Sequence, residues 1–272
     1  SQNGYTYYNG ALSATPAQLL NKNCLVVDGN SNKWVGYNIG GLGKFDANNN
    51  WTIYNTSNSG LPDSAITALA VLNSTTICVG TKNGFAIFDG NSNWTIFNTN
   101  NSSIAGDYIN CIITSGNEIW LGTNSGLSKF SNNIFTNYTL ANGGIINDTV
   151  LSISNTPVAN KIWVGTKRGL TLLDNGVATN FNYQNSALPN YAIQTLLFQS
   201  NRLWVGTNGG GLYQYDGNSF AQLGNTNNNV YSVNNIIWYI EPFNNSILVP
   251  SSTGILEISN GQIINSYFGE FS

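Results

Sequence analysis

The chain has 272 residues, of which only 8% are charged, and its formal net charge at neutral pH is −3. A soluble domain usually carries about a quarter charged residues. The longest apolar stretches, such as Ile109–Thr114 and Ile193–Phe198, have the length of a strand and fall far short of the roughly 20 residues of a membrane-spanning helix. Lys and Arg are few and scattered, which argues against the basic runs that bind nucleic acid or anionic membranes. We therefore expect no nucleic-acid partner and no membrane insertion within this chain.

The residue types that are missing or rare further limit the catalytic and metal-binding chemistry open to the chain. The chain has no His and no Met, and its three cysteines, Cys24, Cys78 and Cys111, lie in apolar, strand-like runs without a CxxC spacing. Without His, the usual catalytic base, the Ser-His-Asp triad and imidazole metal ligands are excluded. We expect buried thiols and no metal or redox site, with at least one cysteine unpaired or bonded to another chain. The missing initiator Met indicates that Ser1 follows a removed leader, so we expect an exported protein.

The first candidate strand, Gly4–Asn9, resembles a later segment, Asn50–Asn55, in its aromatic pattern. Beyond it, one pattern recurs: an apolar pair or Trp, then Val or Leu, Gly and Thr, a short polar turn, a second Gly and an apolar residue. The copies start 41–44 residues apart, at Trp34, Cys78, Trp120, Trp163, Trp204 and, in a degenerate form, Leu248. This is the period of a four-stranded propeller blade.

Each period divides into four strands separated by turn residues. The second copy gives Ile66–Val71, Thr76–Thr81, Phe85–Asp89 and Trp94–Asn98, and the third gives Ile109–Thr114, Glu118–Thr123, Leu127–Phe130 and Ile134–Tyr138. The first strand is apolar at nearly every position, so we expect both of its faces to be covered. The fourth alternates, so we expect one face to meet water.

Glycine and tryptophan recur at fixed places in the period. The glycine after the second turn fits a hairpin that needs a positive φ angle; its copies are Gly84, Gly126, Gly169, Gly211 and Gly254. We expect the glycine of Val-Gly-Thr to admit an aromatic side chain of a neighbouring blade against bare backbone. Trp34, Trp120, Trp163 and Trp204 are then core residues between blades.

These patterns predict an all-β fold: a single domain over residues 1–272, built as a six-bladed β-propeller of four-stranded antiparallel blades. A ring covers both faces of each blade and leaves only short edges. An alternative is a seven-bladed ring completed by residues outside this chain. We predict that Gly4–Asn9 closes the ring as the outer strand of the last blade, where it displaces or competes with Gln262–Phe268. If the last strand closes the ring instead, Gly4–Asn9 is an outer addition.

The repeats resemble the two-component regulator propeller repeat, and the resemblance covers nearly the whole chain. It is carried by Ile119–Phe130, Ile162–Asp174 and Leu203–Asp216, and by the linkers Leu61–Ile66 and Leu188–Ile193. The family implies a propeller of the kind found in Bacteroidetes-type bacteria, in periplasmic glycan-sensing regions of hybrid two-component systems and in secreted or surface proteins. This chain has one ring, no visible membrane span and no kinase motif, which favours a secreted or surface-displayed module.

Two short motifs also resemble a modification signal of such bacteria, in which Asp and then Ser or Thr precede an apolar residue. They are Asp63-Ser64-Ala65 and Asp148-Thr149-Val150. The resemblance implies O-glycosylation at Ser64 and Thr149.

The turns between the second and third strands and the connections between blades share one end of a propeller, which is the expected binding face. The candidate ligand-binding residues there are Asp63, Lys82, Asp107, Tyr108, Asn124, Asp148, Lys167, Arg168, Asn190, Tyr191 and Asn208. Polar groups beside aromatic rings suit sugars, and the basic side chains suit the carboxylate of an acidic sugar. The alternative is that each Asp caps a turn and each basic residue is only solvated.

The sequence thus favours an exported, non-catalytic module that binds a protein or a glycan. One alternative is the glycan-sensing part of a two-component receptor, in a chain that continues beyond Ser272 to a membrane span and kinase. Another is an enzyme, which would need two of Asp63, Asp107 and Asp148 facing each other as in a glycosidase. No cofactor is expected, apart from the option of Ca²⁺ in a ring of aspartates.

Overall fold

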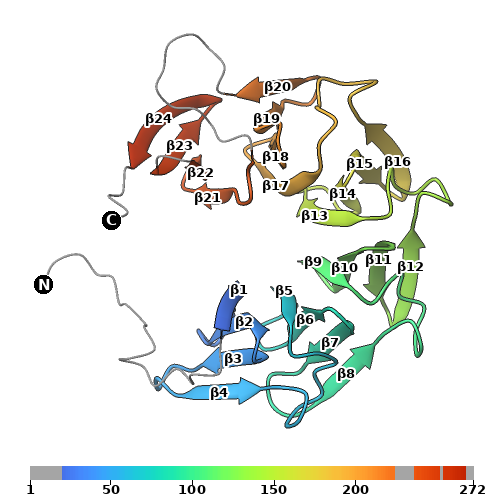
Figure 1. Ribbon diagram of the computed structural model, residues 1–272, viewed down its shortest axis with the longest axis vertical. Coiled ribbons are helices and arrows are strands. Elements are labelled where there is room, and N and C mark those ends of the chain that lie inside the picture. Colours follow the sequence, from blue (N-terminus) through green and yellow to red (C-terminus); the bar gives the residue numbers. More distant parts are fainter. Residues whose placement is uncertain (1–19, 224–235, 252–253, 268–272) are drawn as a thin grey trace, which may run out of the picture. The chain divides into compact units, whose positions relative to one another are not determined.

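The computed structural model describes residues 20–223, 236–251 and 254–267, and in these ranges it contains strands and no helix. The strands form six four-stranded antiparallel sheets, and in each sheet the strands follow one another in chain order (Figure 1). The predicted all-β fold of four-stranded antiparallel units is therefore confirmed.

We number the sheets in chain order. The first contains β1 (Leu20–Val27), β2 (Lys33–Ile39), β3 (Leu42–Phe45) and β4 (Trp51–Tyr54). The second contains β5 (Ile66–Val71), β6 (Ile77–Thr81), β7 (Gly84–Phe88) and β8 (Trp94–Phe97). The third contains β9 (Ile109–Ser115), β10 (Glu118–Thr123), β11 (Gly126–Ser131) and β12 (Ile134–Tyr138).

The remaining sheets repeat this plan. The fourth contains β13 (Val150–Asn155), β14 (Lys161–Thr166), β15 (Gly169–Asp174) and β16 (Val177–Phe181). The fifth contains β17 (Ile193–Gln199), β18 (Arg202–Thr207), β19 (Leu212–Tyr215) and β20 (Phe220–Leu223). The sixth contains β21 (Glu241–Phe243), β22 (Ser246–Ser251), β23 (Gly254–Ser259) and β24 (Gln262–Tyr267). All eight predicted strands of the second and third copies are present, with ends that differ by one residue at most.

The chain forms two compact units. One runs to Ile119 and also contains Ser131–Phe135, and the other contains Trp120–Phe130 and the residues from Thr136 on. The first and second sheets belong to the first unit, and the fourth, fifth and sixth belong to the second unit. The boundary falls within the third sheet, and the single domain over residues 1–272 stays a prediction.

In the second to fifth sheets, the second strand is the most buried strand. Every residue of β6 is buried, and so are all but the first residues of β10, β14 and β18. By contrast, β9 and β17 each have only two fully buried residues, whereas β5 and β13 each have four. The expectation that both faces of the first strand are covered is therefore confirmed for β5 and β13 and holds only in part for β9 and β17. The physical reason is that the first strand lies at the edge of its own sheet, whereas the second is flanked by strands on both sides.

The glycine of Val-Gly-Thr receives a side chain from the next sheet, but that side chain is isoleucine and not an aromatic residue. In the first unit, a Cβ atom on Gly80 would lie 2.7 Å from Cγ2 of Ile109 at the start of β9. In the second unit, a Cβ on Gly206 would lie equally close, at 2.7 Å, to Cγ2 of Ile237. The compact, branched Ile side chain suits a slot made by a single missing Cβ, whereas an aromatic ring would need more space.

The tryptophans that recur in the second strands are core residues, as predicted. Trp34 is fully buried and packs edge-on against Phe88 of the second sheet, with 5.7 Å between ring centroids. In the second unit, Trp163 meets Tyr215 of the fifth sheet at 5.4 Å in the same edge-on geometry. Edge-to-face packing favours such pairs beyond the burial of their area. These rings hold neighbouring sheets together and are closed to a ligand.

The last sheet differs from the prediction. Its outer position is taken by β24, which pairs with β23, so Gln262–Tyr267 is not displaced. A local hairpin explains this, because Asn260 and Gly261 both adopt the positive φ angles (50° and 78°) of the favoured two-residue turn. The segment Gly4–Asn9 lies outside the described residues, and its place in the fold stays a prediction.

The last sheet also lacks the slot for a following isoleucine. Pro250 stands where earlier copies have the glycine of Val-Gly-Thr. Ile255, which pairs with Pro250, is 42% exposed, whereas Leu212, its counterpart in the fifth sheet, is completely buried.

Candidate functional site

The turns between second and third strands are built by the threonine of the repeat. Thr81, Thr123, Thr166 and Thr207 are completely buried. Each hydroxyl donates a hydrogen bond of 2.8 Å to the carbonyl oxygen of the turn glycine, which is Gly84, Gly126, Gly169 or Gly211. These glycines have the predicted positive φ angles, between 79° and 145°. The turns are thus fixed from inside, and the side chains of Lys82, Asn124, Lys167, Arg168 and Asn208 are left exposed.

The connections between sheets are tied to these turns by backbone hydrogen bonds. In the first unit, Gly84 donates its N–H to the carbonyl of Asp107 at 2.8 Å. In the second unit, Lys167 donates to Thr149 at 3.0 Å, and Asn208 donates to Ala192 at 2.9 Å. Within each unit, the two predicted groups of site residues therefore lie at the same end of the sheets.

The three candidate aspartates hold the connections in shape. Asp63 accepts hydrogen bonds from the N–H of Ala65 (2.8 Å) and from the side-chain amide of Asn83 (2.7 Å). Asp107 accepts from both the N–H and the hydroxyl of Thr99, at 2.7 and 2.9 Å. Asp148 accepts from the N–H of Leu140 at 2.7 Å. These contacts favour the capping interpretation over a catalytic pair.

Asparagines that were not predicted from the sequence also hold the four connections that precede the second to fifth sheets. Asn58, Asn101, Asn142 and Asn185 each accept, through Oδ1, the N–H of the residue three positions earlier at 2.8–2.9 Å. Through Nδ2 each donates to the carbonyl five positions earlier, at 2.9–3.1 Å. The available signal was the spacing Asn-x-x-Asn-Ser, which recurs in three of the four copies, whereas the third has Thr139 in the first position and Gly143 in the last. The asparagine-rich composition therefore serves loop structure.

Exposed aromatic side chains provide apolar surface at the connections. Tyr108 and Tyr191 were predicted, and both are exposed. Trp238 and Tyr239, on the segment before the sixth sheet, are exposed by 56% and 59% and were missed because they lie outside the repeat pattern.

The basic candidates are open to solvent. Lys82, Lys167 and Arg168 are exposed and make no ion pair within the part of the chain that the structure describes. Asn190 is exposed as well. These groups are available to a ligand. Lys82 belongs to the first unit, and Lys167, Arg168 and Asn190 belong to the second.

The two predicted glycosylation sites take part in the fold through their backbone. The carbonyl of Ser64 accepts the N–H of Gly41 at 3.0 Å, and that of Thr149 accepts Lys167. Both residues are half-buried. Their modification stays a prediction.

Two carboxylates away from the predicted site are buried and ionised. Burial alone would raise the pKa of Asp28, but hydrogen bonds from Trp34 and Asn32 lower it overall. Glu257, on β23, accepts hydrogen bonds from the side chains of Asn265 (2.9 Å), Ser246 (2.7 Å) and Tyr267 (2.7 Å), which lower its pKa. Both carboxylates are saturated by neighbours on their own sheet, which makes them structural.

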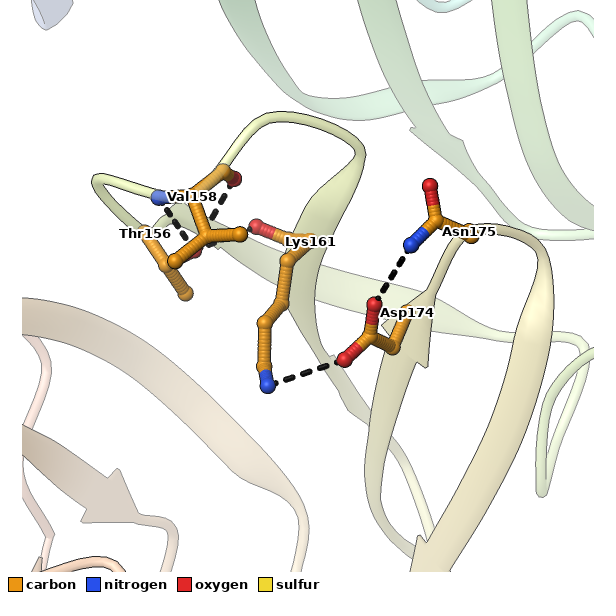
Figure 2. A network of polar contacts seen from close by, with 5 residues as sticks. All are labelled: Thr156, Val158, Lys161, Asp174 and Asn175. Atoms are coloured by element: carbon orange, nitrogen blue, oxygen red, sulfur yellow. Dashed lines mark hydrogen bonds and ion pairs between the residues drawn. The ribbon is translucent and has the colours of Figure 1, made fainter.

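An ion pair marks the end of the fourth sheet opposite to the candidate site (Figure 2). Lys161 Nζ lies 2.9 Å from Asp174 Oδ2, and Asn175 donates to the other carboxylate oxygen at 2.9 Å. Thr156 Oγ1 donates to the Lys161 carbonyl at 2.8 Å and accepts from the N–H of Val158. This network fixes the first and third turns of the sheet.

No cluster of three or more Asp, Glu or Cys side chains able to hold a metal ion occurs among residues 20–223, 236–251 and 254–267. The same residues include no helix long and apolar enough to cross a membrane. Calcium binding stays a prediction.

No family model matches the chain, and no curated protein matches it in sequence. Solved structures share its fold. The extracellular domain of BT3049, assigned to a hybrid two-component system of B. thetaiotaomicron, has a TM-score of 0.71 at 16% identity and is covered over 36% of its length by 93% of this chain. For BT4673 of the same organism the TM-score is 0.57 at 21% identity, over 38% of that domain and 90% of this chain. Virginiamycin B lyase from Staphylococcus aureus gives 0.71 at 12% identity, over 85% of the lyase and 93% of this chain. This chain thus spans little more than a third of the two extracellular domains.

Proposed function

We propose that this chain is an exported, non-catalytic binding module, built as a six-bladed β-propeller. The observation that carries the proposal is made within each unit. At one end of its sheets, buried threonines and connections held by asparagine side chains keep exposed polar and aromatic side chains in fixed loops. Rigid supports under exposed loops are the usual arrangement of binding proteins.

The propeller is supported by the repeat and by the packing between sheets. Four-stranded sheets recur every 41–44 residues, and an isoleucine of the next sheet packs against Gly36, Gly80, Gly165 and Gly206. A sheet with this packing needs a neighbour on each face, and a ring supplies both. A seven-bladed ring completed by other residues is the alternative.

Export is supported by the likeness to two extracellular domains and by the resemblance of the repeats to the two-component regulator propeller family. A periplasmic sensing region is the second candidate function, because both of those domains come from hybrid two-component systems. The intact mass and C-terminal peptides of the protein from its native source separate the two. A chain that runs on to a membrane span and kinase would replace the secreted or surface module with a sensor.

The non-catalytic assignment rests on how the acidic residues are used. Asp63, Asp107 and Asp148 are engaged in the loops that contain them. The lyase with a similar fold has been solved as a catalytically inactive His-to-Ala variant, and the present chain contains no His. The residue type on which that enzyme depends is therefore missing here.

A glycan is the ligand that the exposed residues suit best, with a protein partner as the alternative. We expect retarded migration in native gels that contain a dissolved polysaccharide, tested with xylan, glucomannan and polygalacturonate. Replacement of Lys167 and Arg168 together by Ala should release polygalacturonate and leave the neutral polymers bound, because only the acidic polymer offers carboxylates. Unretarded migration in all three gels would refute glycan binding.

A further inference from the structure

Trp238 is a tryptophan that does not lie in a strand. The chain has seven tryptophans, and six of them lie in the strands β2, β4, β8, β10, β14 and β18. Trp238 lies in the segment before β21 and is 56% exposed, whereas the four core tryptophans are at most 3% exposed. An exposed indole outside the repeat has no role in holding the sheets together.

The backbone around Trp238 is fixed on both sides. Ile237 fills the slot at Gly206, and its N–H donates to the carbonyl of Thr207 at 2.9 Å. The preceding residue, Ile236, forms a bridge with Asn208. In extended chain, successive side chains point to opposite sides. With Ile237 directed into the core, Trp238 is directed out to solvent.

Tyr191 is held at the same turn of the fifth sheet. Asn208 donates its N–H to Ala192, next to Tyr191. The ring of Tyr191 packs on Gly209 and Gly210, where added Cβ atoms would lie 2.7 Å and 3.0 Å from it. Gly209 has a φ angle of 125°, which only glycine adopts readily. The ring is therefore supported on one side and is still 47% exposed.

Uncharged amides accompany the two rings. Asn190 precedes Tyr191 in the chain. Asn208 donates its N–H to Ala192 and forms the bridge with Ile236. Both asparagines are exposed. Each amide offers donors and an acceptor to a hydroxyl group. The ring faces carry partial negative charge and attract the weakly positive C–H groups of a sugar face.

We propose that Tyr191 and Trp238 form a stacking platform for the pyranose ring of an uncharged oligosaccharide, with Asn190 and Asn208 binding its hydroxyls. This inference rests on the proposed binding function and goes beyond it, because it names the residues and the charge class of the ligand. It places the ligand at the fifth sheet, apart from the basic turn at Lys167 and Arg168.

The test is calorimetric titration of the intact protein with cellohexaose, xylohexaose, mannohexaose and trigalacturonate, together with tryptophan fluorescence. A neutral oligosaccharide should bind, shift the emission and protect the exposed indole from acrylamide. Trp238→Ala and Tyr191→Ala should each weaken binding by about tenfold, the loss of one stacking contact. Tyr191→Phe keeps the ring and should bind like the parent.

The matched control is Phe243→Ala, which removes an exposed aromatic ring at the other end of the sixth sheet. It should leave affinity unchanged, and circular dichroism confirms that each variant folds. If the parent and both platform variants bind neutral sugars with equal affinity, the platform is refuted, whereas the proposed binding function is not. The platform is also refuted if only trigalacturonate binds and this binding is lost when Lys167 and Arg168 are replaced. If no oligosaccharide binds, the platform and the proposed glycan binding both fail.

Discussion

At Gly80 the protein uses the lack of a side chain as a packing element. The α-carbon of Gly80 faces Ile109 so closely that an added methyl group would lie 2.7 Å from Cγ2 and 2.9 Å from Cβ of Ile109. Real Cβ atoms do not approach other carbons this closely, so the neighbouring strand β9 would have to move.

We expect Gly80→Ala to lower the free energy of unfolding by about 1–3 kcal/mol, the usual cost of overpacking a core. Urea denaturation measures the change. The double variant Gly80→Ala with Ile109→Ala should be less destabilised than the sum of the two single variants, because the second change removes Cγ2, the nearest atom to the added methyl group. Strictly additive effects would show that the two residues do not share the slot.

Asp28 is a second residue whose role is local. Its carboxylate accepts hydrogen bonds from the Trp34 indole (2.8 Å), from the Asn32 side chain (2.8 Å) and from the N–H groups of Asn30 and Asn32. Although burial opposes ionisation, these donors hold its pKa below the ordinary value of 3.8. Its charge therefore stabilises the folded state above about pH 4, and this stabilisation is lost as the pH falls through the lowered pKa.

Asp28→Asn turns an acceptor of the Trp34 N–H into a donor. We expect a loss of about 1–3 kcal/mol at pH 7, because a buried donor is left without a partner. As the pH is lowered from 5, the variant should also lose less stability than the parent does. Urea midpoints measured across this pH range test both points, and an equal acid dependence in the two proteins would contradict the role given to the carboxylate.

At the scale of elements, the connections between sheets depend on asparagine. Asn101 accepts the N–H of Asn98 at 2.9 Å and donates to the carbonyl of Ile96 at 3.1 Å. Asn100, its neighbour, is exposed, and its side chain has no hydrogen bond in the described connection. The two residues thus form a matched pair of the same chemical type.

Asn101→Ala should lower stability by about 1 kcal/mol, since one side chain closes two hydrogen bonds of the loop. Asn100→Ala should be neutral, and thermal unfolding distinguishes the two. If both substitutions have the same effect, general asparagine content and not the bonded position determines loop stability.

The strands could be predicted from the sequence because each is bounded by turn residues, whose conformational preferences are local. The turn glycines and the buried tryptophans followed from the same local rules. The partner of the Val-Gly-Thr glycine did not, since nothing in one strand tells whether its neighbour offers Ile or an aromatic ring.

The candidate site was predicted only in part, for a related reason. Asp63, Asp107 and Asp148 lie at the predicted end of the sheets, but the sequence does not reveal that Thr99 and Leu140 already occupy two of them. Trp238 was not predicted, because it lies outside the repeat. Residues outside a repeat cannot be identified from its periodicity.

At the scale of the whole molecule, two cysteines report on unfolding. Cys24 and Cys78 lie on β1 and β6 in the first unit, and burial raises the pKa of each thiol to about 12. A thiol reacts with alkylating reagents as the thiolate. In the folded protein both should therefore be almost inert near pH 8.

We expect pulsed alkylation in increasing urea to label Cys24 and Cys78 at the same midpoint that circular dichroism gives for the whole chain. Coincident transitions indicate one cooperative unit. Mass spectrometry of the labelled peptides makes the measurement. Labelling at a lower urea concentration than the dichroism transition would mean that the first unit unfolds by itself, which would contradict the predicted single domain.

The fit between glycine and isoleucine also bears on how such a gene can grow. Since the fit joins two consecutive repeats, duplication or loss of one complete period of 41–44 residues recreates the same pair at the new junction. Copies can therefore be gained or lost within the series without compensating substitutions. In the sixth sheet Pro250 replaces the glycine, so this copy lacks the slot into which an isoleucine could pack. Relatives with different repeat numbers should accordingly differ in the copies that keep the glycine and not in the copy that contains Pro250.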